Sequence, residues 1–533
     1  MIPRRPLVWV AFAEGALVGR LLLIWRSSPW SLNPDGVDYI AVARMWEQWR
    51  PWAAINAYRS PLYSWVLLAL HRCGLDYLAA ARVVGIASCV LLCAITYPLA
   101  LAVLRSRRLA AASVALLALP PTLNRAVLLI TPDILTAAMV AAAMLALTRM
   151  VERWRPWQGA IVGGLAGLSY LAKAYCLPFF ALLVPLCLLL PSARRTVRRH
   201  TRRSTRSSTM RAIWPLLAGP AGRSVGAALL CMALVCAPWV AAMHAKYGRW
   251  TFGSAGKYNW LVFTLGRPLG QHNGDLFHPG DPMPPGHPRW NESTIPTAVE
   301  ARRVPEIALN QATDSLKLLG AWVGVVAVTL AGYAVAMTLA EREDPGAWVL
   351  FGGSLLYALG YLPMALWYRY AWGALPAVVT AAVLGVHRLA RDVARKTRLS
   401  GRAVWAVVVC ITVLQMAVTQ RGDSRVLEDK RPRWQAVHRA GLYVGAHSAP
   451  GEAVLSHPRC PGDGLYVSFY GQRPVRQLSA EEARSVVAAG GSWKGFLVAP
   501  TFVKGMGPPI YTWRSPELVG QIGLFRLPSG PQR

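Results

Sequence analysis

Long blocks of apolar residues, separated by short polar connections, repeat along most of the chain. A helix that crosses the hydrocarbon layer of a bilayer needs about 20 residues, and about eleven blocks approach that length. The expected spans are 7–24, 81–104, 109–121, 132–149, 158–172, 174–190, 223–243, 316–340, 347–366, 371–388 and 403–419. This pattern predicts an all-α polytopic membrane protein. Residues 7–24 are expected to be a retained first helix, because no small-residue cleavage site follows them.

Two of the polar connections are long enough to contain structure of their own. Residues 25–80 include six tryptophans, a residue type that favours the headgroup layer. Within them, residues 38–50 have apolar positions at helical spacing and predict an amphipathic surface helix. Residues 61–72 are apolar but too short to span, which predicts an interfacial or re-entrant helix. The connection 244–315 is rich in Pro and Gly and predicts an irregular loop.

The chain becomes polar after Gln420. The short runs LYVSFYG, GFLVAPTF and IGLFRL are typical of strands, and AEEARSVVAAG, between two of them, is typical of a helix. We therefore expect residues 1–420 to form a transmembrane domain with outer loops 25–80 and 244–315, and residues 421–533 to form a small soluble α/β domain. We expect no catalytic residue there, and we interpret His457 and Cys460 as an ordinary surface pair.

Composition and charge agree with a membrane protein. Only 15% of the residues are charged and the mean hydropathy is +0.33, whereas soluble proteins contain about 25% charged residues. The formal net charge of +32 comes largely from basic connections at 105–108, 194–211 and 388–402. Lys and Arg in short connections stay on the cytoplasmic side. A cytoplasmic N-terminus places all three inside and the C-terminal domain outside. We expect a cytoplasmic (inner) membrane protein with no nucleic-acid partner.

This topology brings several ionisable residues to the outer side. Asp35 and Asp38 follow the first span, and Arg59 precedes the interfacial segment that contains Tyr63; Asp133 opens the fourth span, Lys173 ends the fifth, and Arg369 lies between the ninth and tenth. Each has an ordinary explanation as a turn residue, a helix cap or a headgroup contact. Ionisable groups in or near spans are nevertheless functional candidates, because their insertion is costly. Carboxylates and cations on one face predict a site for a phosphorylated lipid with a proton acceptor.

Six short motifs, spread over about the first 390 residues, occur in a recognisable order. They are NPDGVDYIAVARMW, where Asp35, Tyr39, Ala43 and Arg44 match; YRSPLYSW, where Arg59 stands for a Lys; LITPDILTAAMVAAAML; GGLAGLSYLAKAYCLPFF; APWVAAMHAKYG; and WYRYAWGALPAV. Their order resembles the membrane-embedded glycosyltransferases that use polyprenyl-phosphate sugars, in particular the bacterial relatives of protein O-mannosyltransferase and of the lipid A aminoarabinose transferase. That family often has Asp-Glu where this chain has Asp35-Gly36. Either Asp38 supplies the second carboxylate or there is none.

The resemblance implies an inverting glycosyltransferase that moves a sugar from a polyprenyl-phosphate donor to a lipid, glycan or protein acceptor at the outer face. It implies that Asp35 is the base, with Asp38 and Asp133 as further catalytic candidates, that Arg59, Lys173 and Arg369 bind the donor phosphate, and that Tyr39, Tyr63 and Tyr370 line the substrate. No cofactor is required. A divalent cation is compatible with these residues, but no metal ligand is assigned. Two other classes stay open: a polysaccharide polymerase or ligase, and a lipid or sugar transporter or flippase without chemistry.

Overall fold

The computed structural model describes residues 6–190, 218–259, 325–341, 344–361, 368–397, 400–449, 452–489, 495–501, 508–514 and 521–527, with scattered residues between 305 and 320. Three expected features fall wholly or largely outside these ranges. They are the arginine-rich connection, the loop 244–315 beyond residue 259, and the first part of the span 316–340.

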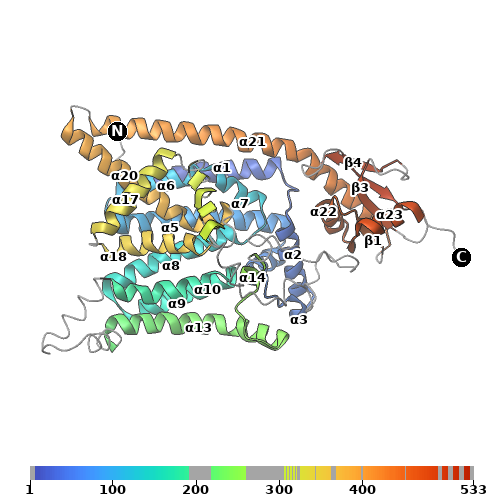
Figure 1. Cartoon of the computed structure of the whole chain (residues 1–533), viewed down its shortest axis with the longest axis horizontal. Helices are drawn as coiled ribbons and strands as arrows, with labels where there is room; N and C mark the ends of the chain where they lie inside the picture. Colours follow the sequence, from blue (N-terminus) through green and yellow to red (C-terminus); the bar gives the residue numbers. More distant parts are fainter. Residues whose placement is uncertain are drawn as a thin grey trace.

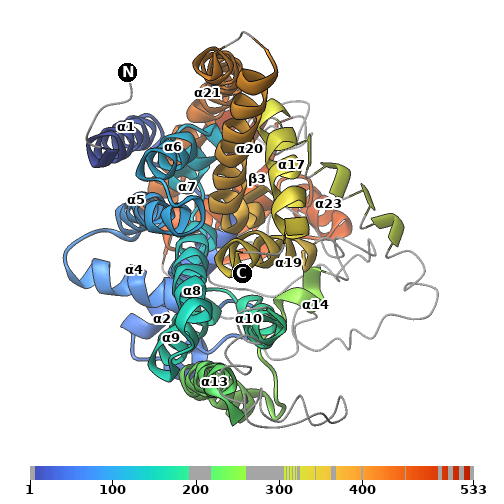
Figure 2. The same cartoon turned by 90° about the vertical axis from the view of Figure 1, so that its left-hand side faces the viewer.

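Helices make up nearly all of the described part before residue 450. In chain order they are α1 (Pro6–Ser27), α2 (Pro34–Glu47), α3 (Pro51–Ala54), α4 (Leu62–Arg72), α5 (Tyr77–Leu104), α6 (Arg107–Ala118), α7 (Arg125–Leu128), α8 (Asp133–Arg153), α9 (Pro156–Ala172), α10 (Cys176–Leu186), α13 (Pro220–Tyr247), α14 (Ala255–Asn259), α17 (Val325–Glu341), α18 (Pro345–Ala347), α19 (Gly353–Leu359), α20 (Leu375–Lys396) and α21 (Gly401–His447). Short 3-10 or π turns lie at Pro121–Asn124, Cys187–Leu189, Trp348–Gly352 and Tyr368–Ala374. The long helices run side by side in Figure 1 and are seen nearly end-on in Figure 2.

Six helices of the described part are long and apolar enough to cross a membrane. They are Pro6–Ser27, Tyr77–Leu104, Asp133–Arg153, Pro220–Tyr247, Arg369–Lys396 and Gly401–Arg421. A seventh span results if α6 and the helix Pro121–Leu128, which meet at 57°, are counted as one. Several expected spans correspond to shorter apolar helices, such as Cys176–Leu189 and Pro345–Leu359. The protein is a multi-pass membrane protein, and the count of eleven spans stays a prediction.

Helix α9 packs against α13 through glycines that recur every fourth residue. A Cβ atom added at Gly159 would lie 2.0 Å from the Ser224 carbonyl oxygen, and one added at Gly163 would lie 2.1 Å from that of Ala228. Gly167 similarly faces Val235. Small residues at such spacing let helix backbones approach closely, which is a main source of helix association in membranes. This contact fixes α9, and with it the residue that follows its last turn, Lys173.

The first outer segment folds into two helices where they were predicted. Residues 38–50 fall mainly in α2, which begins earlier, at Pro34, and residues 61–72 form α4. The prediction of a simple surface helix is wrong for α2, because more than half of its residues are buried. They are covered by α4 on one side and by the C-terminal part of the chain on another. This enclosure gives α2 a fixed position at the end of the helix bundle.

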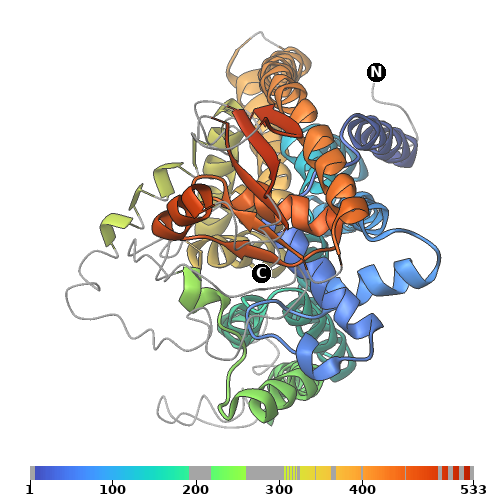
Figure 3. The same cartoon turned by 90° about the vertical axis from the view of Figure 1, so that its right-hand side faces the viewer.

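The C-terminal part contains a five-stranded mixed sheet at one end of the molecule (Figure 3). Its elements are β1 (Ala453–Ser456), α22 (Pro461–Gly471), β2 (Val475–Gln477), α23 (Ala480–Ala489), β3 (Gly495–Pro500), β4 (Tyr511–Arg514) and β5 (Gln521–Arg526). The strand order is β2-β1-β3-β5-β4. The first three strands are parallel, and β5 runs antiparallel to both β3 and β4.

Of the four sequence runs for which an element was predicted, three form that element. The strands β3 and β5 and the helix α23 are confirmed. The run LYVSFYG is not a strand but the last part of α22, packed between α21 and β1. Residues 465–471 are buried or half-buried throughout, and in so short an apolar run a buried helix and a buried strand look alike. Cys460 is also buried, with its thiol 3.3 Å from the Val498 carbonyl oxygen, so it is not a surface residue.

Helix α21 joins the two parts of the molecule. It runs without a break from Gly401 to His447, through the boundary expected near residue 420, and reaches the sheet (Figure 1). The Arg433 guanidinium on α21 pairs with the buried Asp463 carboxylate of α22 at 3.0 Å. The Tyr470 hydroxyl donates to the Trp30 carbonyl oxygen at 2.6 Å. Residues of α2, α4 and α22 share one apolar core, so the C-terminal part rests directly on the helices that surround the candidate site.

Candidate functional site

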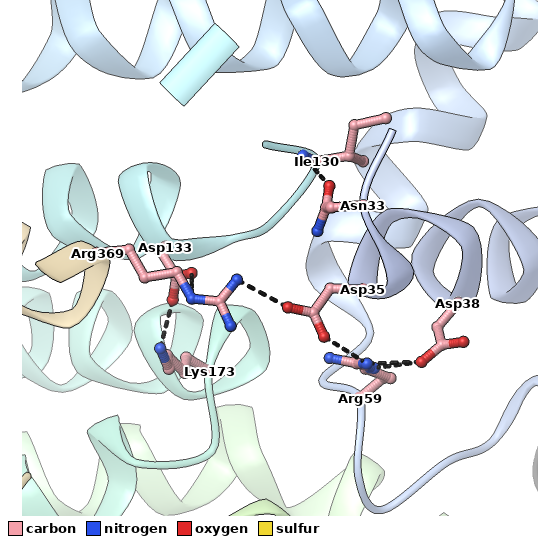
Figure 4. A network of polar contacts seen from close by, with 8 residues as sticks. All are labelled: Asn33, Asp35, Asp38, Arg59, Ile130, Asp133, Lys173 and Arg369. Atoms are coloured by element: carbon pink, nitrogen blue, oxygen red, sulfur yellow. Dashed lines mark hydrogen bonds and ion pairs between the residues drawn. The ribbon is translucent and has the colours of Figure 1, made fainter. Parts of the chain in front are cut away.

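The six charged residues predicted from the sequence form one continuous network (Figure 4). Carboxylates and cations alternate along it in the order Asp38, Arg59, Asp35, Arg369, Asp133 and Lys173. These residues come from segments that are far apart in the sequence. Three negative and three positive charges meet there, so the network is neutral as a whole.

Asp35 lies at the centre of the network. Its Oδ1 accepts a hydrogen bond from Arg59 Nη2 at 2.7 Å, and its Oδ2 accepts one from Arg369 Nη1 at 2.7 Å. Arg59 also donates to Asp38 Oδ2, through Nη2 at 2.6 Å and Nε at 3.2 Å. At the other end, Arg369 Nε lies 3.4 Å from Asp133 Oδ2, and the Lys173 ammonium pairs with Asp133 Oδ1.

Local backbone structure holds each of these side chains. The Asn56 side-chain oxygen accepts hydrogen bonds from the amides of Tyr58 and Arg59, which fixes the loop before α4. The Asn33 side-chain oxygen accepts from the Ile130 amide at 2.8 Å. That bond joins the start of α2 to the segment that leads into α8 (Figure 4). This bond therefore helps to position Asp35 and Asp133 relative to each other, in addition to the ion pairs.

The ends of the helices suit the charges placed there. Asp133 is the first residue of α8, and Asp35 lies in the first turn of α2. Helix N-termini carry a partial positive charge that stabilises carboxylates. Lys173 follows the last residue of α9, where the partial negative charge stabilises a cation. Its ammonium nitrogen also lies 3.6 Å from the centre of the Tyr370 ring, a distance at which cation–π attraction is effective.

A cavity of about 560 Å³ opens beside the network. Asp35, Arg59, Asp133, Lys173 and Arg369 line it, as do Tyr39 and Tyr370. Asp38 does not, because it contacts Arg59 from the side away from the cavity. Tyr63 does not line it either: this residue is 2% exposed and packs edge-on against the Tyr39 ring. The geometry makes Asp38 a residue that positions Arg59 and makes Tyr63 part of the core.

Gly36 explains why this chain lacks a second acidic residue next to Asp35. A Cβ atom at position 36 would lie 2.7 Å from the Ile130 Cβ atom. A glutamate there would have to push apart the start of α2 and the segment leading into α8, which the bond between Asn33 and Ile130 holds together. The second carboxylate near Arg59 is that of Asp38, one turn further along α2.

Charge also controls the acidity of Asp35. Burial raises the pKa of its carboxyl group, but the charges and hydrogen bonds of Arg59 and Arg369 outweigh that effect and hold the pKa well below its ordinary value. The same pairing holds the pKa of the Arg59 guanidinium well above its ordinary value, although burial acts in the opposite direction. Both groups are therefore ionised at neutral pH.

Comparisons with known proteins support the resemblance that the sequence motifs indicate. Residues 58–204 match the family model described as dolichyl-phosphate-mannose-protein mannosyltransferase. The structure is similar to that of ArnT from Cupriavidus metallidurans bound to undecaprenyl phosphate, with 12% identity, coverage of 98% of this chain and 99% of that chain, and a TM-score of 0.57. It is also similar to the oligosaccharyltransferase from Archaeoglobus fulgidus in the apo form, with 12% identity, coverage of 93% and 69%, and a TM-score of 0.52. The resemblance to the membrane-embedded glycosyltransferase superfamily is confirmed.

No curated protein sequence matches this chain. The match to the mannosyltransferase model includes Arg59, Asp133 and Lys173. Asp35, Asp38 and Arg369 lie outside it and join the network only through the fold. The structure thus adds half of the network to the part that the family model covers.

Sequence reasoning found Tyr39 and Tyr370 but missed other aromatic residues of the cavity. Tyr175 and Tyr361 line it beside Tyr370, and the Tyr361 and Tyr370 rings stack with their centres 4.8 Å apart. Trp250 and Phe252 line another part of the cavity. Gly253, next in the chain, brings that segment close to Ala174. The sequence signal for these residues was weak. A run of aromatic residues surrounds Arg369, but aromatic side chains are common at membrane interfaces whatever their role, so the run alone does not indicate a site.

Among the residues that the structure describes, no group of three or more His, Cys, Asp or Glu side chains is arranged to hold a metal ion. The carboxylates of Asp35, Asp38 and Asp133 each accept from Arg or Lys instead. As arranged here, these three carboxylates do not form a ligand set for a divalent cation. The expectation that no cofactor is required, with a divalent cation compatible, stays a prediction.

Proposed function

We propose that the protein is an inverting glycosyltransferase, which moves a sugar from a polyprenyl-phosphate donor to a lipid, glycan or protein acceptor at the outer face of the cytoplasmic membrane. The observation that carries the proposal is the alternating network of charges along one cavity. Its cations suit a phosphate, and its central carboxylate suits a proton in transfer. That the transferred group is a sugar, that the acceptor is a lipid, glycan or protein, and that the site lies at the outer face are all parts of this proposal.

In this reaction the acceptor hydroxyl oxygen attacks the anomeric carbon from the side opposite the phosphate. The bond between that carbon and the phosphate oxygen breaks, its electron pair leaves with the polyprenyl phosphate, and the hydroxyl proton passes to the Asp35 carboxylate. Arg59, Lys173 and Arg369 then stabilise the negative charge that grows on the leaving phosphate. Fixed charges of this kind, placed in advance where transition-state charge develops, supply a large part of enzymatic catalysis.

The ion pairs of Asp35 indicate an order of events. Both of its oxygens accept from an arginine, so the carboxylate is a weak base in the free protein. A donor phosphate that takes Arg59 and Arg369 as partners draws them away from Asp35. The basicity of Asp35 then rises when the donor is bound, and an acceptor that arrives second meets a stronger base. The ion pairs of Asp35 thus support an order in which the donor binds before the acceptor.

This order predicts two different pH profiles. The value of kcat/KM for the donor reports ionisation in the free protein, and kcat reports ionisation in the complex. Because the pKa of Asp35 in the free protein lies below its ordinary value of about 3.9, kcat/KM should stay flat as the pH falls from about 8 to about 5. The acidic limb of kcat should lie at higher pH than that of kcat/KM. Coincident acidic limbs would contradict the release of Asp35 by the donor.

The proposal is tested with purified protein in nanodiscs, a panel of radiolabelled polyprenyl-phosphate sugars, and a membrane-lipid extract as acceptor. We expect label in a new product together with equimolar release of polyprenyl phosphate. In proteoliposomes, donor that changes leaflet without covalent transfer would identify a flippase instead. Label that appears only in long glycan chains would identify a polymerase or ligase.

A further inference from the structure

A second cleft lies on the face of α2 that points away from the reaction site. It has a volume of about 720 Å³ and is formed by α2 and the residues just after it, the end of α4, the start of α5, and the C-terminal helices α21 and α22. Arg44, a motif residue without a role in the charge network, lines it. Arg44 and Asp35 are nine residues apart, which is two and a half turns at 3.6 residues per turn. The two side chains therefore leave α2 on opposite sides.

Arg44 is held by aromatic rings. Its guanidinium carbon lies 5.8 Å from the centre of the Tyr77 ring and 5.0 Å from that of the Phe469 ring. No carboxylate among the described residues lies within ion-pairing distance of it. Stacking of this type fixes the plane of a guanidinium and leaves its N–H groups available for a planar or tetrahedral anion.

The two carboxylates of the cleft are both occupied by other partners. Glu47 accepts from the Tyr77 hydroxyl at 2.8 Å, and its other oxygen lies 3.2 Å from His71 Nε2. Asp76 accepts from the Leu78 and Ala79 amides and so caps α5. Both carboxylates keep their negative charge in these bonds, but neither forms an ion pair with Arg44. A half-buried arginine that makes no direct ion pair within the described part of the chain, and that lines an open cleft, is suited to a ligand with an anionic group.

The surroundings of the cleft indicate where that ligand comes from. Trp49 and Trp52, which follow α2 directly, are 82% and 56% exposed. Exposed indoles near the ends of membrane helices favour the headgroup layer. The anions that this layer supplies are the phosphates of lipid headgroups.

We propose that this cleft binds the phosphate of an anionic membrane lipid, with Arg44 as the main contact. The bound headgroup bridges α2 and α22, and so connects the C-terminal part to the helix that carries Asp35. The proposal is independent of sugar transfer, because it concerns a different face of α2 and a different ligand.

The test measures the binding of short-chain dihexanoyl phosphatidylglycerol to detergent-purified protein by microscale thermophoresis. We expect saturable binding to the wild type and binding weakened by about tenfold or more in Arg44→Gln, the usual loss when a charge-assisted hydrogen bond is removed. Arg44→Lys should be affected less, because it keeps the charge but loses the planar contact. Arg72→Gln is the matched control: it removes an exposed arginine at the end of α4, outside the cleft, and should bind like the wild type.

Inorganic phosphate separates the two sources of the anion. We expect it to compete only weakly with the lipid. If it competes with the same affinity as the lipid, the ligand is free phosphate and the proposal of a lipid headgroup is wrong. Unchanged lipid affinity in Arg44→Gln, or equal losses in Arg44→Gln and Arg72→Gln, would overturn the site. Thermal unfolding of each variant shows whether it is folded. If Arg44→Gln is not, the comparison of Arg44→Lys with Arg72→Gln decides, because equal affinities there also overturn the site.

Discussion

Replacing Asp35 by asparagine is expected to lower sugar transfer by at least about a hundredfold, in line with the loss of a general base. The protein should still fold, because each arginine retains a carboxylate partner: Arg59 still pairs with Asp38, and Arg369 still pairs with Asp133. Donor binding should be unchanged or tighter, because the network gains a net positive charge. The measurement is steady-state transfer, with kcat and the donor KM determined separately on protein of equal thermal stability.

Asp38→Asn is the matched control for this variant. It also removes a carboxylate partner of Arg59, but from the side that does not line the cavity. Its effect should be much smaller and should appear in the donor KM, because Arg59 becomes less well positioned. An inactive Asp38→Asn beside an active Asp35→Asn would reverse the two assignments.

Arg59→Gln and Arg369→Gln are each expected to reduce donor affinity or kcat/KM for the donor by roughly tenfold to a hundredfold. The reason is the loss of a charge-assisted bond to phosphate, worth about 1.5–3 kcal/mol. Arg→Lys at either position should recover only part of this, because an ammonium group cannot make a two-pronged contact. Donor binding by isothermal titration calorimetry and transfer kinetics together give the measurement.

Arg105→Gln provides the control for general effects of losing an arginine. Arg105 pairs with Asp344 at 3.2 Å but is 77% exposed and does not line the cavity. It should leave donor affinity and turnover unchanged. If Arg59→Gln and Arg369→Gln behave like Arg105→Gln, these cations do not bind the donor phosphate, and the proposed function loses its main support. A loss of purified yield without a change in donor affinity would assign them to membrane insertion instead.

The sequence predicted which side chains to examine but not how they pair. Hydropathy and the basic connections were enough to place six charged residues at one end of the bundle. The side on which each connection lies follows from the lengths of the helices and from the alternation of inner and outer connections. Pairing depends on side-chain direction within a few ångströms. The sequence therefore favoured Asp35 over Asp38 as the base, but it could not show that Asp38 and Tyr63 stay outside the cavity that Asp35 and Tyr39 line.

The sequence by itself determined the membrane class, the positions of most long helices, the helices α2 and α4 in the first outer segment, and the strands β3 and β5. These elements depend on local periodicity and on runs of apolar residues, which are visible in any window of the chain. Contacts between distant segments decided the rest. The helix at LYVSFYG depends on packing between α21 and β1, and Gly36 is required by its contact with Ile130. Arg44 faces its own cleft because α22 folds back onto α2. Such contacts join residues that are tens to hundreds of positions apart, so no local pattern contains them.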